Sequence, residues 1–263
     1  MSGVRIEILA RAEAGRFAAE RIVERARSGR LRTLGVATGS SAEPVYEALV
    51  RLPGARAALA GVTAYALDEY VGLADTDANS YRTTLERQFT QPLGLTSAAL
   101  RVPDGTALDP RAEAGRYERE LAERGGADLQ LLGIGSNGHI AFNEPGADLD
   151  GRTHVVELTA QTRADNARFF TEPGAVPTLA ITQGVGTIMS ADELLLLAFG
   201  PEKADALHAA LTGPVTSAVP ASAVQAHRRV TVLADEAAAG QLLAGGALGE
   251  RDVLVQGMTS VGA

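Results

Sequence analysis

The sequence predicts an α/β protein built on an open, mainly parallel β-sheet with helices on both of its faces. Short aliphatic or β-branched runs alternate with helix-length segments along the whole chain, which is the pattern of repeated βαβ units. Several of these runs, above all Leu194–Phe199, are continuously apolar, as strands covered on both faces are. A length of 263 residues suits one large domain spanning residues 1–263.

Each predicted strand is an apolar run too short to form a helix of its own. In chain order the predicted strands are Val4–Leu9, Leu34–Ala37, Val62–Leu67, Asp128–Leu132, His154–Leu158, Leu194–Phe199 and Val230–Leu233. The segments between them place apolar residues about 3.6 positions apart, which predicts helices. One such helix runs from Glu43 to Leu52, and another opens near Gly200 and runs to Leu211.

Composition and charge exclude several kinds of partner and site. Lys and Arg number 24 against 32 Asp and Glu, and the net charge of −8 disfavours nucleic acid and anionic membranes as partners. The absence of cysteine excludes disulfides, thiolate metal ligands and a cysteine nucleophile. Residues 1–9 lack the pattern of a signal peptide and no apolar run could span a bilayer, so we expect a cytoplasmic protein. The 29 glycines indicate many tight turns or close backbone approaches.

The loop after the second predicted strand, Thr38-Gly39-Ser40-Ser41, is a candidate anion site. Ligands of parallel sheets bind beyond the carboxyl ends of the strands. Here small hydroxyl side chains and backbone N–H groups gather before the helix predicted from Glu43, and helix N-termini bind anions. Because the loop lacks the lysine of a P-loop, a single phosphate or carboxylate is a better ligand than a nucleoside triphosphate. The alternative is a plain N-cap with a glycine turn.

Two acids, Asp68 and Glu69, directly follow the third predicted strand. In an extended chain they point in different directions, so one of them faces the carboxyl edge of the sheet. Apolar neighbours raise the pKa of a carboxyl group held there, toward the value of a useful general base. The alternative is that these acids cap the helix that follows.

The loop after the fourth predicted strand, residues 133–138, has the spacing of a dinucleotide-binding G-x-G-x-x-G motif. That motif must open a long helix, whereas Pro145 and the turn-rich residues after it end any helix here, so we exclude a dinucleotide. The same stretch contains polar side chains of catalytic types: Asn137, His139, Asn143 and Glu144. A lone histidine is usually structural, but one on a glycine-rich loop with a carboxylate five residues away indicates an acid–base site.

Three basic residues could also reach this edge of the sheet. Lys203 lies in the first turn of the helix after the sixth predicted strand, and Arg163 and Arg168 lie on a short predicted helix at Thr162–Phe170. By themselves such residues are mostly solvent-exposed.

Taken together, several segments resemble the glucosamine-6-phosphate deaminase family, the glucosamine and galactosamine-6-phosphate isomerases. They are TGSS at 38–41, LDEYVGL at 67–73, LLGIGSNGHIAFNEPG at 131–146, TRADNARFF at 162–170 and AITQGVGTIMSADELLLLAFGPEKADAL at 180–207. The resemblance covers nearly the whole chain in the family's order. The 6-phosphogluconolactonases, which share the fold, resemble it only as far as GH and then continue differently.

The resemblance implies a Rossmann-like fold and the conversion of glucosamine 6-phosphate to fructose 6-phosphate and ammonia in amino-sugar catabolism. This aldose–ketose isomerisation with loss of the C2 amine needs proton transfers but no electron sink, so neither a cofactor nor a metal is implied. By motif, Asp68 takes the C2 proton and passes it to C1, and His139 with Glu144 and Asn137 opens the sugar ring. The residues implied to bind the substrate or its phosphate are Thr38, Gly39, Ser40, Ser41, Gly135, Arg168 and Lys203.

Two departures from the family pattern lead to further predictions. Many members have Asp two residues before the histidine, where this chain has Asn137, so Glu144 is predicted to be the sole charged partner of His139. Members activated by N-acetylglucosamine 6-phosphate carry a serine and additional basic residues after FNEP. Ala147 and the stretch around His154 replace them here, so the activator site is predicted to be absent.

Residues 147–183 resemble the family's mobile lid over the sugar, and this segment carries Arg168. We expect a monomer or a small homo-oligomer. The alternatives are a same-fold enzyme like the 6-phosphogluconolactonases, an enzyme specific for galactosamine 6-phosphate, and a non-catalytic sugar-phosphate sensor. The joint presence of Asp68, His139 and Glu144 disfavours the sensor.

Overall fold

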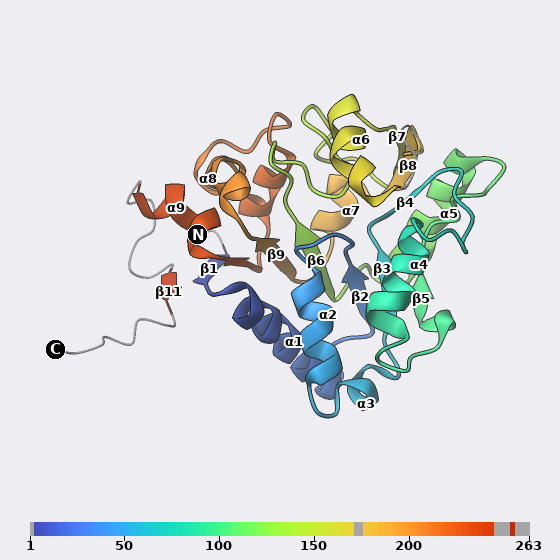
Figure 1. The fold of residues 1–263 in the computed structure, drawn as a ribbon, viewed down its shortest axis with the longest axis horizontal. Coiled ribbons are helices and arrows are strands. Elements are labelled where there is room, and N and C mark those ends of the chain that lie inside the picture. Colours follow the sequence, from blue (N-terminus) through green and yellow to red (C-terminus); the bar gives the residue numbers. More distant parts are fainter. Residues whose placement is uncertain (1–2, 171–175, 245–252, 256–263) are drawn as a thin grey trace.

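Two sheets organise the chain, a large parallel one and a small antiparallel one (Figure 1). The structure, a computed structural model, describes residues 3–170, 176–244 and 253–255. The large sheet has the strand order β11-β1-β10-β9-β6-β2-β3-β5, and its neighbouring strands are parallel. The predicted fold class is confirmed. The strands are β1 (Val4–Ile8), β2 (Thr33–Val36), β3 (Thr63–Ala66), β5 (Leu100–Arg101), β6 (Leu129–Gly133), β9 (Leu194–Ala198), β10 (Val230–Ala234) and β11 (Val253–Val255).

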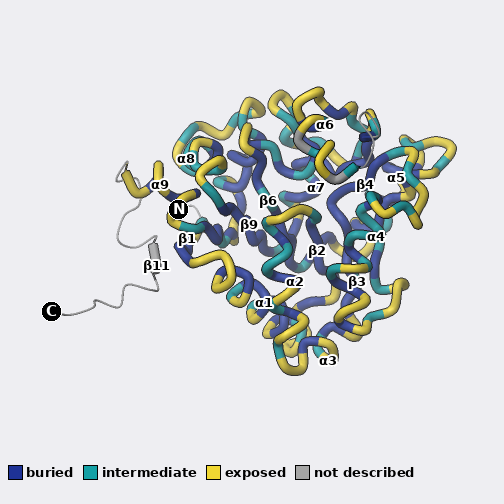
Figure 2. The backbone as a smooth tube through the Cα atoms, in the orientation of Figure 1, coloured by how far each residue is buried: buried dark blue, intermediate teal, exposed yellow. Residues whose placement is uncertain are grey.

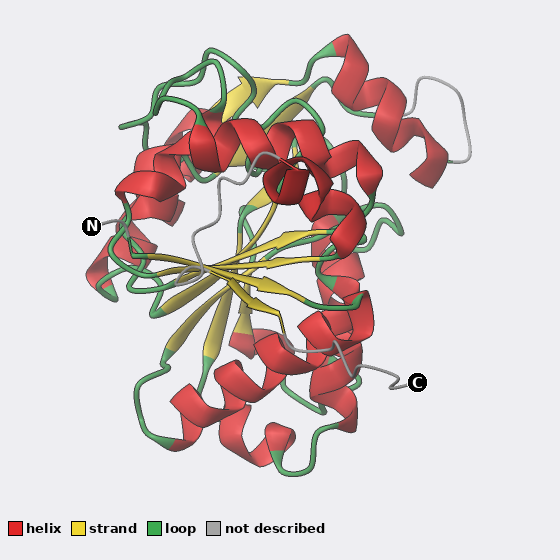
Figure 3. Cartoon of the chain, turned by 90° about the vertical axis from the view of Figure 1, so that its left-hand side faces the viewer, coloured by secondary structure: helices red, strands yellow, loops and turns green. Residues whose placement is uncertain are grey.

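Helices lie on both sides of the large sheet (Figure 3). The helix α1 buries Ala14, Ala18 and Ile22, which are four positions apart and so form one apolar stripe that faces the core. The helices around the large sheet are α1 (Arg11–Arg27), α2 (Glu43–Arg51), α3 (Ala55–Leu59), α4 (Tyr81–Leu85), α5 (Pro110–Glu123), α7 (Val185–Met189), α8 (Ala204–Thr212) and α9 (Glu236–Ala244). Further helical segments of 3-10 or π type are η1 (Glu86–Thr90), η2 (Ser97–Ala99), η4 (Pro201–Lys203) and η5 (Pro220–Ala226).

The central strands form the core of the molecule, as Figure 2 shows for β2, β6 and β9. The four leucines of β9, Leu194–Leu197, have no exposed surface. This confirms the interpretation of that run as a strand covered on both faces, since a continuous apolar run is stable only where neither face meets water.

The order of the strands reverses between β2 and β6. From β2 the chain proceeds outward to β3 and β5, and from β6 it proceeds the other way to β9 and β10. The carboxyl ends of β2 and β6 are therefore the switch point of the sheet, the place where open parallel sheets bind their ligands, and we call this edge of the sheet the crevice.

The prediction that His154–Leu158 joins the parallel sheet is wrong. The strand β7 (His154–Glu157) pairs antiparallel with β8 (Leu179–Thr182), and β8 pairs antiparallel with β4 (Asp68–Tyr70). The physical reason is that no helix forms between β6 and β7, and a parallel return requires such a crossover. The short strands β4, β5, β8 and β11 were not predicted.

The small sheet carries its own apolar cluster beside the crevice. The helix α6 (Ala160–Asn166) and the turn η3 (Ala167–Phe169) follow β7 and lie at the top of Figure 1. The cluster consists of Tyr70, Phe142, Leu158, Val176 and Ala180. Residues 171–175 of the predicted lid segment lie outside the described residues.

Candidate active site

The loop Thr38–Ser41 and the loop Gly133–Gly138 lie side by side at the crevice. A Cβ atom placed on Gly133 would be 3.8 Å from the Cβ of Ser41. The sequence predicted both loops as candidate sites, and the reversal of strand order explains why they meet: β2 and β6 are neighbours in the sheet although almost a hundred residues separate them.

The Thr38–Ser41 loop presents unpaired backbone donors. Gly39 has φ +93°, a left-handed conformation that favours glycine, and turns the chain into α2. The N-cap of α2 is Ala42, which provides no side-chain cap. Among the described residues, no group accepts a hydrogen bond from the backbone N–H of Gly39, Ser40 or Ser41. Such a cluster of N–H groups at a helix N-terminus is suited to an anion.

Arg11 holds this loop in place and was missed by the sequence analysis. Its guanidinium donates to the backbone oxygen of Ser40, lies 3.7 Å from the carboxylate of Glu43, and has its central carbon 5.7 Å from the centroid of the Phe199 ring. Phe199 follows β9, so Arg11 ties the loop after β2 to the end of another strand. Its position at the start of α1 carries no sequence signal of this contact.

The two acids that follow β3 lie in β4 and have different roles. The sequence left open whether these acids act as a base or cap the next helix, and the structure assigns one acid to each alternative. Glu69 accepts hydrogen bonds from the backbone N–H groups of Tyr70, Tyr81 and Arg82, each at 2.9 Å, and two of these donors belong to the start of α4. Glu69 thus caps a helix. Among the described residues, the Asp68 carboxylate has no hydrogen-bond partner.

Asp68 has the electrostatic character of a base. Burial, together with the nearby charge of Glu69, raises the pKa of Asp68 from 3.8 to about 8. Burial also raises the pKa of Glu69, but three backbone donors oppose this effect. Burying a carboxyl group without a hydrogen-bond partner lowers the stability of the folded protein. Such a group is therefore a strong candidate for a functional residue.

The loop after β6 brings its histidine back over its own backbone. A Cβ atom on Gly135 would lie 2.2 Å from Cε1 of His139, so only glycine fits beneath the imidazole. Ala141 has φ +50°, a strained conformation for a residue with a side chain. The turn at Ala141 returns the chain so that Glu144 faces His139. The sequence assigned Gly135 to substrate binding, which remains a prediction, and did not reveal its contact with His139.

Asn137, His139 and Glu144 form a hydrogen-bonded relay. The amide nitrogen of Asn137 donates to Oε2 of Glu144 at 2.7 Å, and its carbonyl oxygen lies 2.7 Å from Nδ1 of His139. Glu144 Oε2 is 3.7 Å from that same nitrogen. Because Glu144 can only accept from the amide, the oxygen of Asn137 must face the imidazole, and this assigns the proton to Nδ1. Asn137 is therefore a bridge between the other two residues.

The unpredicted strand β8 joins this loop to Asp68. Asn143 donates to the backbone oxygen of Gln183 at 2.8 Å, and the backbone N–H of Phe142 donates to Oγ1 of Thr182 at 3.2 Å. Thr182 is paired with Asp68 in the small sheet. Asn143, a candidate from the sequence, thus has a structural role: it fixes the His139 loop to the strand beside the proposed base.

The helix α6 contacts both halves of the crevice. Thr162 donates a hydrogen bond from its hydroxyl to Oε1 of Glu144. One turn later, the amide of Asn166 donates to the Tyr70 hydroxyl at 2.9 Å, and the Tyr81 hydroxyl donates to the same oxygen at 3.3 Å. Tyr81 in turn interacts with the side chain of Thr38. Sequence reasoning missed these polar contacts because no local pattern places α6 over the sheet.

The three basic candidates lie in segments that follow β9 and β7. Lys203 is partly exposed in η4, directly after β9, and Arg168 is exposed in η3, directly after α6. Arg163 is partly buried on α6, and its Nε atom is buried without a hydrogen-bond partner. Contact of Arg168 or Lys203 with a bound phosphate remains a prediction.

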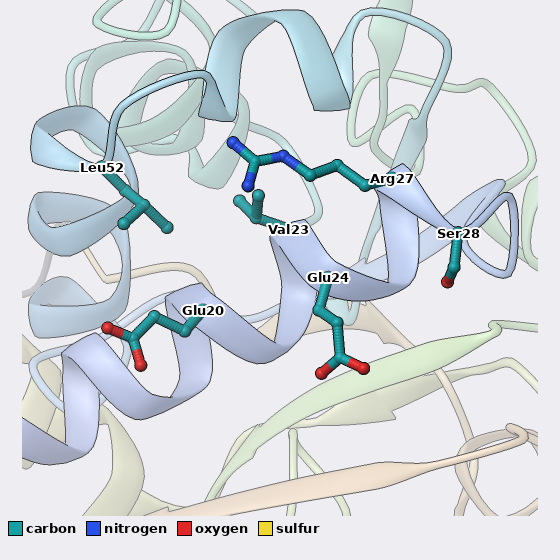
Figure 4. A pocket seen from close by; sticks show the side chains of 6 residues that line it. All are labelled: Glu20, Val23, Glu24, Arg27, Ser28 and Leu52. Atoms are coloured by element: carbon teal, nitrogen blue, oxygen red, sulfur yellow. The ribbon is translucent and has the colours of Figure 1, made fainter.

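A separate surface hollow lies at the opposite edge of the sheet (Figure 4). Arg27 and Ser28 line it at the end of α1, just before β2 begins, so it is at the amino ends of the strands. Its other lining residues include the acids Glu20 and Glu24. A hollow rimmed by carboxylates at the amino edge does not suit the anion that the crevice loops favour.

The described ranges contain neither a membrane-spanning helix nor a cluster of metal ligands. None of the helices there has the length and apolarity needed to cross a bilayer. No cluster of three or more His, Asp or Glu side chains there could hold a metal ion.

Comparisons with known proteins agree with this geometry. A family model described as glucosamine-6-phosphate isomerases/6-phosphogluconolactonase matches residues 7–233. The glucosamine-6-phosphate deaminase of Cutibacterium acnes is 47% identical over 229 residues, which cover 87% of this chain and 88% of the relative. That of Streptomyces coelicolor is 51% identical over 213 residues, 80% of this chain and 81% of the relative.

Solved structures show the same relationship. A monomeric glucosamine-6-phosphate deaminase has a TM-score of 0.86 and 40% identity, and the match covers 90% of this chain and 99% of that one. A 6-phosphogluconolactonase from Trypanosoma cruzi has a TM-score of 0.73 over 92% of this chain and 98% of that one, but at 19% identity it shows the fold alone. This chain belongs to the family of glucosamine-6-phosphate isomerases and 6-phosphogluconolactonases.

Proposed function

We propose that this protein converts glucosamine 6-phosphate and water to fructose 6-phosphate and ammonia. The single observation that carries the proposal is the pairing, across one crevice, of a buried and unpaired base with an acid–base relay: Asp68 on β4, and Asn137, His139 and Glu144 on the loop after β6. The relatives with 47% and 51% identity that are named glucosamine-6-phosphate deaminase support the same substrate.

The relay suits ring opening. With the Nδ1 proton of His139 held by the oxygen of Asn137, Nε2 is the nitrogen assigned to exchange a proton with the sugar's anomeric hydroxyl and ring oxygen. Glu144 accepts its hydrogen bond from the amide of Asn137, whose oxygen in turn faces Nδ1 of the imidazole. An amide orients the imidazole and polarises it, and the charge that stabilises an imidazolium comes from Glu144, 3.7 Å away.

Asp68 suits the isomerisation that follows. In the open-chain sugar it takes the proton from C2 and returns it to C1, and the C2 amine then leaves as ammonia after water adds at C2. A carboxylate whose pKa is raised to about 8 is a stronger base than an ordinary aspartate. The backbone N–H groups of the Thr38–Ser41 loop, with Arg168 and Lys203, are assigned to the phosphate, because an N–H cluster, a guanidinium and an ammonium together suit a dianion.

The test of this function is ammonia release, with glucosamine 6-phosphate, galactosamine 6-phosphate and 6-phosphogluconolactone as parallel substrates. The expected result is ammonia and fructose 6-phosphate from the first substrate. Hydrolysis of the lactone without ammonia release would favour the lactonase alternative, which the description of the matching family model also names. Preference for the galactosamine compound would assign the other stereochemistry at C4.

The Arg168→Ala variant is expected to bind substrate weakly. Loss of one guanidinium from a phosphate site raises KM about tenfold or more, because a charge-assisted pair contributes about 1.5–3 kcal/mol. Its melting temperature should stay that of the wild type, since Arg168 is exposed. The matched control is Arg16→Ala on α1, whose side chain is 67% exposed. An unchanged KM in Arg168→Ala would remove this residue from the phosphate site.

The kinetics are expected to be hyperbolic. We propose that the second phosphate site of activated relatives is absent, because Ala147 and the stretch around His154 replace the serine and basic residues of that site. Initial rates against glucosamine 6-phosphate should therefore fit a hyperbola with or without N-acetylglucosamine 6-phosphate. A sigmoidal curve that this compound makes hyperbolic would contradict the proposal.

We also propose a cytoplasmic location, a single domain over residues 1–263 and a monomer or small homo-oligomer. A phosphorylated sugar substrate and a chain without cysteine are consistent with the cytoplasm. The neighbour with 40% identity is described as monomeric. The segment 147–183 is proposed to act as a lid, since α6 from this segment covers the crevice and carries its hydrogen bonds to Glu144 and Tyr70.

A further inference from the structure

We propose that Thr162 is a positioning residue for the reaction: its hydroxyl holds the Glu144 carboxylate in the orientation that the Asn137–His139 pair requires. The proposal rests on the function proposed above. Thr162 lies on α6, in a different part of the chain from the loop that carries the relay, so it links the covering helix to the acid–base group.

The direction of the Thr162 hydroxyl is set by its neighbours. Oγ1 of Thr159, the N-cap of α6, donates to Oγ1 of Thr162 at 3.0 Å. The Thr162 oxygen is therefore an acceptor on that side, and its only hydrogen is directed to Oε1 of Glu144. Thr162 is 7% exposed, so water competes poorly for this hydrogen bond.

The two oxygens of Glu144 are thereby held by donors from two different elements. Oε1 accepts from Thr162 on α6, and Oε2 accepts from the Asn137 amide at 2.7 Å. A carboxylate held at both oxygens cannot rotate, so the Asn137 amide keeps its donor side toward Glu144 and its oxygen toward His139. If the carboxylate were free to rotate, only the backbone N–H of His139, which donates to the Asn137 oxygen at 3.1 Å, would resist a flip of the amide that presents its nitrogen to the protonated Nδ1.

A change at Thr162 can be made without disturbing α6. The backbone N–H of Thr162 donates to Oγ1 of Thr159 at 3.1 Å and so completes the N-terminal cap. Thr162→Val keeps this backbone group and the branched shape of the side chain and loses only the hydroxyl. Thr162→Ser keeps the hydroxyl. The two variants therefore separate packing from hydrogen bonding.

The chain also offers a matched control outside the site. The hydroxyl of Thr153 donates to Oε2 of Glu118, and Thr153 is 8% exposed. Thr153→Val therefore removes the same type of bond, from the same residue type, at the same burial. Glu118 is held additionally by Thr187, whose hydroxyl donates to the same oxygen at 2.8 Å, so this cluster belongs to the packing of α5, β7 and α7.

The experiment measures kcat and KM for ammonia release from glucosamine 6-phosphate by the full chain. Thr162→Val is expected to lower kcat at least about tenfold with KM within about twofold, because the lost interaction acts on the proton-transfer step rather than on the phosphate. Thr162→Ser should recover most of kcat, and Thr153→Val should keep it within about twofold. Melting temperatures of all variants identify any loss of folded protein.

A double-mutant cycle with Glu144→Ala tests whether Thr162 acts through that carboxylate. Without the carboxylate, Thr162→Val should cause no additional loss, so the double variant should equal Glu144→Ala alone. Losses that multiply, wild-type kcat in Thr162→Val, or no recovery in Thr162→Ser would each overturn the proposal. Those outcomes in an active wild type would leave the proposed function intact, whereas a wild type that releases no ammonia would overturn both.

Discussion

The Asp68→Asn variant is expected to lose activity and gain stability. Without a base to take the C2 proton, kcat should fall at least about a thousandfold, since a positioned base contributes about 10²–10⁴-fold and an amide cannot replace it. The variant should nevertheless resist unfolding better than the wild type at pH 8, because the wild type must ionise a buried carboxyl that has no partner.

The stability difference between Asp68→Asn and the wild type is expected to depend on pH. The pKa of Asp68 is raised from 3.8 to about 8 in the folded protein, so between those values the folded state binds a proton that the unfolded state has released. The contribution of Asp68 to the free energy of unfolding is fully present below about pH 4 and is lost as the pH rises toward 8. The advantage of Asp68→Asn in free energy of unfolding should therefore be small at pH 4 and reach a few kcal/mol at pH 8, at about 1.4 kcal/mol per pKa unit.

The activity of the wild type is expected to increase with pH over the range in which its stability decreases. The base must be ionised, so kcat/KM of the wild type is expected to rise with pH up to about 8, where Asp68 loses its proton. Glu69→Gln is the comparison variant: it keeps Asp68 but removes the charge that helps raise the pKa of Asp68, so its rise in kcat/KM should lie at a lower pH than in the wild type. Turnover by Asp68→Asn within about tenfold of the wild type would show that another group is the base.

The Glu144→Gln variant is expected to have the second-largest effect, a loss of at least about a hundredfold in kcat, or about 2.7 kcal/mol in the activation barrier. A glutamine removes the carboxylate of the relay. A glutamine has one acceptor oxygen where Glu144 has two, so its amide nitrogen must face either the Asn137 amide nitrogen or the Thr162 hydroxyl, both of which now donate to Glu144. One of these two hydrogen bonds is therefore lost.

The Asn137→Asp variant is expected to lose much less activity than Glu144→Gln. It restores the aspartate that many family members have, and its carboxylate can accept from Nδ1 of His139 as Asn137 does, so kcat should stay within about tenfold of the wild type. Two carboxylates then meet where an amide now donates to Glu144 at 2.7 Å, and they must share a proton. The pH–rate profile should shift accordingly. Equal losses in Glu144→Gln and Asn137→Asp would refute the assignment of Glu144 as the charged partner.

The sequence was most informative where a residue pattern is physically compatible with only one kind of structure. The continuous run Leu194–Phe199 predicted a doubly covered strand because only burial on both faces tolerates it, and the structure has β9 there. Pro145 excluded a long helix after the glycine-rich loop, and the structure has turns. His154–Leu158 failed because a strand's partner depends on the connection that precedes it, which an apolar run does not encode.

The candidate site divides in the same way. The residues Asp68, Asn137, His139 and Glu144 could be named from chemistry and motif. Residue chemistry alone did not distinguish Asp68 from Glu69, and only the resemblance to the family assigned the role of base to Asp68. The structure separates them by hydrogen bonding, since three backbone donors reach Glu69 and no described group reaches the Asp68 carboxylate. Arg11 and Thr162 had no sequence signal, because each meets its partner across a long stretch of chain.

The sequence by itself thus determined the fold class, the loops at the carboxyl ends of the strands and the chemical types gathered there, because hydrophobic periodicity and side-chain chemistry are local properties of the chain. Only the tertiary structure decided which groups meet. The neighbouring positions of β2 and β6 bring the Thr38–Ser41 loop beside the histidine loop, and the unpredicted strand β8 joins that loop to Asp68. The covering helix α6 closes the arrangement by binding Glu144 through Thr162. These contacts depend on strand order and long-range pairing, which arise from burial of the whole chain at once.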